Sequence, residues 1–147
     1  MTRDDLLAFM RSHKYAVESS VSPSGAPQAA VVGIAVSDRL EVVFDTLTIT
    51  RKADNLRRQG RIAFVIGGTL DGDERTVQYE GVADEPSGAE RERLVAVYLD
   101  RFPDGRARQQ WPGLIYIRAR PTWIRYSDYG TDPPTIVEFS DSDLTSG

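Results

Sequence analysis

The chain has 147 residues and a net charge of −4, with 40% hydrophobic and 27% charged residues. This is the composition of one globular domain, expected over residues 1–147. It contains no cysteine and one histidine, His13, which excludes disulfide scaffolds, thiol catalysis and Cys/His zinc sites, so no metal site is expected.

The mildly acidic charge disfavours nucleic acid as a partner. The N-terminus lacks the pattern of a secretory signal, and no apolar stretch approaches the ~20 residues that cross a bilayer. We therefore expect a cytoplasmic protein without membrane contact.

The first elements in chain order are a short helix and three strands. Thr2, followed by Asp5, predicts a capping box for an amphipathic helix over residues 3–12. Period-two patterns then predict three strands that form a meander. The predicted strands cover residues 15–21, 28–36 and 40–44.

The rest of the chain alternates helices and strands. A short helix is predicted over residues 50–60, and a capping box of Ser87 with Glu90 opens a longer helix that Pro103 ends. Residues 140–147 form a polar tail that we expect to be frayed. The remaining predicted strands cover residues 61–67, 75–83, 114–120, 122–126 and 135–139.

Short turns join most of these strands, which favours antiparallel pairing. Seven or eight strands with two or three flanking helices indicate an α+β fold built on a closed or split β-barrel.

The sharpest chemical signal lies where the helix after residue 49 begins. Thr50 is predicted to be its N-cap, which places Arg51 and Lys52 in the first turn. Cations are disfavoured there by ~0.3–1 kcal/mol each because the helix end is already positive. A bound phosphate would reverse that penalty. The alternative is a solvated basic helix that continues through Arg57, Arg58 and Arg61.

This segment resembles the phosphate-binding element of the FMN-binding split β-barrel proteins, the pyridoxamine 5′-phosphate oxidase-like superfamily. The residues that carry the resemblance are Phe44 at a strand end, Thr46, the triplet Thr50-Arg51-Lys52, and Leu56. The order of elements over about residues 3–139 is also similar. The resemblance implies an antiparallel split β-barrel that forms a homodimer, with the cofactor between the subunits.

The resemblance also implies how the cofactor is held. Arg51 and Lys52 would bind the flavin phosphate, Thr50 would donate its hydroxyl and amide, and Thr46 would lie close to the cofactor.

Residues 29–34, which include Val31 and Val32, would run along the flavin ring and supply backbone hydrogen bonds. Gln78 matches a glutamine-bearing strand that reaches the flavin, although an exposed strand glutamine explains it equally well.

The implied function is an FMN-dependent oxidoreductase acting on an unidentified small molecule, with catalytic residues unknown. The ending after residues 123–129 lacks the segment with which the founding oxidase holds its substrate phosphate, so pyridoxamine phosphate oxidation is not expected. The alternatives are a deazaflavin-dependent reductase, a non-catalytic flavin- or haem-binding module, and a barrel whose basic helix meets an acidic partner.

Overall fold

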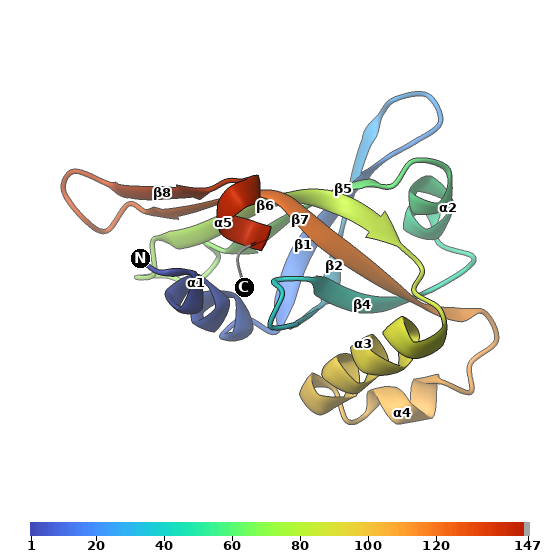
Figure 1. The fold of residues 1–147 in the computed structure, drawn as a ribbon. Helices are drawn as coiled ribbons and strands as arrows, with labels where there is room; N and C mark the ends of the chain where they lie inside the picture. The colour runs from blue at the N-terminus through green and yellow to red at the C-terminus, as the bar shows by residue number, and fades with distance from the viewer. Residues whose placement is uncertain (146–147) are drawn as a thin grey trace.

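The structure is a computed structural model and describes residues 1–145. Its strands form one antiparallel sheet that curls into an open barrel, with helices outside it (Figure 1). The strands are β1 (Tyr15–Val21), β2 (Pro27–Gly33), β3 (Ala35–Val36), β4 (Val42–Leu47), β5 (Arg61–Gly67), β6 (Arg75–Asp84), β7 (Leu114–Asp128) and β8 (Thr135–Phe139). The helices are α1 (Arg3–Arg11), α2 (Arg51–Arg58), α3 (Gly88–Arg101), α4 (Gly105–Arg108) and α5 (Asp141–Thr145).

The strand order is β2-β1-β5-β6-β7-β4-β3, with β8 paired to β7, and every pairing is antiparallel. The two ends of this order, β2 and β3, are not paired to each other, although β2 lies against β4. The barrel is therefore split along this seam, and the predicted α+β split barrel is confirmed.

The predicted three-strand meander is wrong because the second strand breaks at Ile34, between β2 and β3. β1 and β2 form a hairpin, but β3 pairs with β4 at the far end of the sheet. A Cβ on Gly33 would lie 2.8 Å from the ring of Phe102, so α3 packs directly against the backbone here.

The two strands predicted over residues 114–120 and 122–126 are one continuous strand, β7. Pro121 sits at a register shift between Glu80 and Gly81 of β6, where a bulge accommodates the missing N–H group. A Cβ on Gly81 would lie 2.3 Å from the carbonyl oxygen of Arg120, so only glycine allows this approach.

The three longer helices are close to their predicted positions, but one of the two capping boxes is not formed. Thr2 and Asp5 make the reciprocal bonds that the sequence predicts. Ser87 makes no side-chain cap bond. The Glu90 carboxylate, which would complete the box by accepting the Ser87 backbone N–H, instead accepts hydrogen bonds from Arg93 and Arg118.

The helices α4 and α5 were not expected. The frayed tail is wrong as far as residue 145, because α5 packs Leu144 into the core; residues 146 and 147 lie outside the described residues. No helix within residues 1–145 is long and apolar enough to cross a bilayer.

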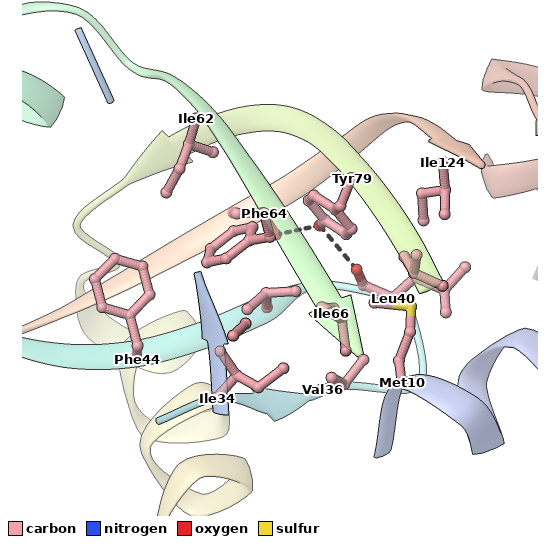
Figure 2. Packing of buried hydrophobic residues seen from close by; sticks show 14 of the residues in the cluster. Met10, Ile34, Val36, Leu40, Phe44, Ile62, Phe64, Ile66, Tyr79 and Ile124 are labelled. Carbon is pink, nitrogen blue, oxygen red and sulfur yellow. Dashed lines mark hydrogen bonds between the residues drawn. The ribbon is translucent and has the colours of Figure 1, made fainter. Parts of the chain in front are cut away.

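The main core fills the barrel with side chains from the inner faces of the strands (Figure 2). Phe44, Phe64 and Tyr79 pack edge to face, at centroid distances of 6.0 and 5.5 Å. The Tyr79 hydroxyl lies 2.9 Å from the Leu40 carbonyl oxygen and 3.1 Å from that of Ala119, so its single proton is shared between the turn before β4 and the neighbouring strand β7. This core fixes β1, β2 and β5 relative to α2, where the candidate site lies.

Candidate functional site

The N-terminus of α2 is built by Thr50, which caps the helix in an extended conformation. Its hydroxyl accepts the Ala53 N–H at 3.4 Å and donates to the Leu47 carbonyl at 2.9 Å, and its own N–H donates to the same carbonyl. The Thr46 hydroxyl lies 3.0 Å from the Thr50 hydroxyl, which leaves Thr46 as the donor of that pair. Both donors of Thr50 that were expected to reach a phosphate are therefore used inside the turn, where they shape the helix start.

Arg51 and Lys52 occupy the first turn of α2 and form no hydrogen bond or ion pair through their side chains with any residue that the structure describes. Their backbone N–H groups precede the first intrahelical bond, from Asp54 to Thr50. Further along the same helix, Arg57 pairs with Glu85 and Arg58 donates to the carbonyl of Val21. Two cations and free amides thus converge at the positive end of the helix.

These cations line a hollow, although Arg51 also remains exposed to solvent. We call it the α2 pocket; its volume is about 90 Å³, and it lies between the helix start and the hairpin of β1 and β2. Its lining residues are Glu18, Ser20, Gln28, Ala29, Ala30, Arg51 and Lys52. A second hollow of about 230 Å³ shares Gln28 and Arg51 with it and runs along α2 toward Arg58. Each is smaller than the ~300–1,000 Å³ of a typical small-molecule pocket, so neither hollow by itself encloses a cofactor-sized ligand.

Asn55 holds α2 against the hairpin. Its amide is buried, and Nδ2 donates to the Ser20 hydroxyl at 3.1 Å and to Gln28 Oε1 at 2.9 Å. Both acceptors also line the α2 pocket. Sequence reasoning missed this positioning residue, although a polar side chain next to Leu56 on the inner side of a short helix was a detectable signal.

Glu18 is the most unusual group in the α2 pocket. Only 1% of it is exposed, and its Oε1 atom has no hydrogen-bond partner among residues 1–145. Burial raises the pKa of the Glu18 carboxyl, and the hydrogen bond to Ser20 and the charge of Lys52 offset this only in part. Sequence reasoning missed Glu18 as well; its signal was a carboxylate at the inward position between Ala16 and Ser20 of a period-two strand.

The predicted ring-binding residues lie on both faces of the sheet. Val32 points into the core, whereas Val31 is 68% exposed on the outer face. Since β2 ends the strand order, alternate residues of β2 direct their backbone groups into the seam, where a ligand can bind them.

Gln78 is not brought to the α2 pocket within one chain. It lies on the outer face of β6, in register with Val65, Val17 and Val31 on successive strands. Three strand spacings separate it from β2, which is ~14 Å. Its predicted role in flavin binding stays a prediction.

The fold and the pocket together define an antiparallel split barrel with two cations at a helix start beside its seam. The sequence profile described as pyridoxamine 5′-phosphate oxidase matches residues 2–128, and the chain belongs to this family. A comparison with curated proteins finds no match.

Solved structures support the fold at low sequence identity. The heme-binding protein of Mycobacterium smegmatis has a TM-score of 0.79 at 17% identity, covering 94% of this chain and 58% of its own. The pyridoxamine 5′-phosphate oxidase-related, FMN-binding protein of Nostoc punctiforme has a TM-score of 0.69 at 15% identity, covering 96% and 92%. HutZ, the heme storage protein of Vibrio cholerae, has a TM-score of 0.70 at 15% identity, covering 82% and 91%. This chain thus spans little more than half of the first of these proteins.

Proposed function

We propose that the protein binds FMN at the start of α2 and acts with it as an oxidoreductase on a small molecule. The observation that carries the proposal is the pair of cations at the positive end of α2 beside the seam, Arg51 and Lys52, whose side chains form no ion pair or hydrogen bond within residues 1–145. Cations at a helix N-terminus are unfavourable unless an anion neutralises them. A phosphate there would receive charge-assisted hydrogen bonds from both side chains and from the free first-turn amides.

The relatives support this choice of ligand. The Nostoc punctiforme protein with the same fold binds FMN, and the family is that of a phosphate-recognising oxidase. A guanidinium grips phosphate oxygens in a bidentate manner and an ammonium adds a compact charge, so the donor set of Arg51 and Lys52 fits a phosphate monoester.

Bound FMN supplies the transfer of hydride or electrons, so the chain needs no nucleophile or metal of its own. The proposed tasks of the chain are to anchor the phosphate through Arg51 and Lys52 and to present the free backbone of β2 to the ring. We assign no catalytic residue.

We further propose that the protein is a homodimer whose subunits share the cofactor. The two hollows beside α2 enclose too little volume for a flavin, so a second wall is required. Val31, Val17 and Val65 lie side by side on adjacent strands of the outer face, and each is exposed. This valine strip begins on β2, the strand that also borders the α2 pocket, so a second copy seated on the strip would lie next to the cofactor.

Two other ligands remain candidates. A deazaflavin coenzyme could use the same anchor, and the proteins of Mycobacterium smegmatis and Vibrio cholerae bind or store heme. His13 is the only imidazole of the chain, and its Nδ1 lies 3.1 Å from both the Phe9 carbonyl and the Ser12 hydroxyl at the end of α1. No imidazole lines the α2 pocket, which favours the flavin.

The test is the double variant Arg51→Ala with Lys52→Ala, titrated with FMN, a deazaflavin coenzyme and haem. It removes two charge-assisted contacts worth ~1.5–3 kcal/mol each, so FMN affinity should fall at least ~100-fold. The matched control is Arg57→Ala with Arg61→Ala, which removes the same charge from residues that line neither hollow beside α2 and should change FMN affinity less than ~3-fold.

Unchanged FMN affinity in the first variant would reject the anchor. Haem binding without flavin binding would show that the protein is a haem-binding module and would reject the flavin proposal. If FMN binds but the loaded protein oxidises neither NADH nor NADPH and reduces no dye, the protein is a flavin carrier and not an enzyme.

A further inference from the structure

A buried carboxylate lies in a pocket that we assign to a phosphate. Glu18 reaches the α2 pocket from β1, and its Oε1 atom is buried without a hydrogen-bond partner among the described residues. An unsatisfied buried acceptor is costly, and the cost is larger when the group is ionised. Groups of this kind in folded proteins call for an explanation, which a ligand donor would supply.

The residues around Glu18 do not supply a hydrogen-bond donor to its Oε1 atom. Its cross-strand neighbours are Ala30 on β2 and Phe64 on β5, neither of which carries a side-chain donor. On β1 itself, Ser20 lowers the pKa of the carboxyl, and from α2 the charge of Lys52 does the same. Lys52 forms no ion pair within 4 Å of Glu18. One oxygen of the carboxyl therefore still lacks a donor.

The negative charge of Glu18 determines which group of a ligand can contact it. A phosphate oxygen would be repelled by the carboxylate, so the phosphate must lie on the outer side of the pocket, at Arg51 and the first amides of α2. The part of the ligand that reaches Glu18 must be a neutral hydrogen-bond donor. The terminal torsion of a glutamate side chain is soft, so the carboxyl can turn toward such a donor at little cost.

We propose that Glu18 accepts a hydrogen bond from a hydroxyl group of the chain that joins the ligand to its phosphate, and that it makes the pocket selective for polyol phosphates. This inference rests on the phosphate anchor proposed above and specifies which group of the ligand binds next to the phosphate. FMN meets the requirement because its ribityl chain carries hydroxyl groups beside the phosphate. Haem does not, because its propionates are anions that Glu18 would repel.

The experiment compares two small probes of equal chain length, ribitol 5-phosphate and n-pentyl phosphate, by calorimetric titration of the full chain. A hydrogen bond to a charged acceptor should make ribitol 5-phosphate bind ~10–100-fold more tightly than n-pentyl phosphate. Glu18→Met removes the acceptor and retains the volume, so this ratio should fall to ~1. Binding of n-pentyl phosphate itself should stay unchanged or become tighter, because a negative charge has been removed.

Glu18→Gln is the second variant and keeps an acceptor without the charge, so it should give a ratio between those of the wild type and Glu18→Met. If Glu18→Met weakens both probes equally, Glu18 has only a structural role and the inference is wrong. If both variants keep the wild-type ratio, Glu18 does not contact the ligand, and the inference is also wrong.

FMN binding distinguishes failure of this inference from failure of the proposed phosphate anchor. If the wild type binds FMN but the ratio does not depend on Glu18, only the role proposed for Glu18 is wrong. If the wild type binds neither FMN nor either probe, the anchor itself fails.

Discussion

At the scale of single residues, the charges around the α2 pocket are not placed for stability. Arg51 and Lys52 lie at the wrong end of a helix dipole, and Glu18 is a carboxylate with an unsatisfied oxygen. Each placement lowers the stability of the folded chain when the α2 pocket is empty. Such local conflicts are typical of functional sites, where a ligand later satisfies the groups.

We predict that Glu18→Gln stabilises the ligand-free protein above the titration of Glu18. The folded-state pKa of Glu18 is raised from its ordinary value of 4.5, mainly by burial, so the folded chain holds this proton more tightly than the unfolded chain. Stability is therefore lost as the pH rises from the unfolded to the folded pKa, and the penalty is fully present above that window.

Urea unfolding of the wild type and Glu18→Gln measures this effect. The variant should be the more stable protein at about pH 8, and the difference should disappear at about pH 4, where both side chains are neutral. A variant that is less stable at both values would mean that Glu18 stabilises the fold through contacts of its own.

At the scale of elements, α3 is fastened to the sheet by a buried ionic network. Arg118 on β7 is 3% exposed and donates to Asp84 at 2.8 and 2.9 Å, to Glu41 at 3.2 Å and to Glu90 at 3.1 Å. Arg93 from α3 donates to Glu41 at 2.9 and 3.0 Å. Burial alone would raise the pKa of Glu41, but hydrogen bonds from Arg93 and the other donors outweigh it, and the pKa is lowered.

We predict that Arg118→Met lowers the free energy of unfolding by ~3–5 kcal/mol, because it leaves the buried Glu41 carboxylate with less compensation. The matched control is Arg125→Met on the same strand, whose partner Glu138 is exposed and whose loss should cost ~0–1 kcal/mol. Chemical denaturation near neutral pH measures both. Equal losses in the two variants would contradict a special role for the buried network.

At the scale of the whole molecule, the outer face of the sheet carries the valine strip of Val31, Val17 and Val65, uncovered in the single chain. We predict that Val17→Lys, at the centre of the strip, converts a dimer to a monomer in sedimentation experiments. The side chain already faces solvent in the monomer, so the fold should be retained. FMN affinity should fall at the same time, because the second wall of the cofactor cleft is lost.

The control is Ile136→Lys on β8, an exposed aliphatic residue outside the strip, which should leave the dimer intact. A wild-type protein that sediments as a monomer, or a Val17→Lys variant that remains a dimer, would disprove the proposed interface.

The sequence alone was sufficient for the features that depend on near neighbours. The Thr2–Asp5 box, the cap at Thr50 and the period-two strands each rest on contacts within a few positions, and all are present in the structure. The position of Arg51 and Lys52 at a helix start follows from the same local chemistry. Their anion-binding role is an inference that the fold makes more specific by placing a pocket beside them.

Only the tertiary structure decided the features that depend on distant contacts. Phe102 packs against Gly33 next to the break at Ile34, and Arg118 on β7 binds the Glu90 carboxylate that the predicted capping box assigned to Ser87. The burial of Glu18, whose Oε1 has no hydrogen-bond partner among residues 1–145, depends on elements that pack beside β1, including α2 more than thirty residues later in the chain. Local patterns report dihedral preferences and period, whereas burial and charge pairing depend on which elements the fold brings together.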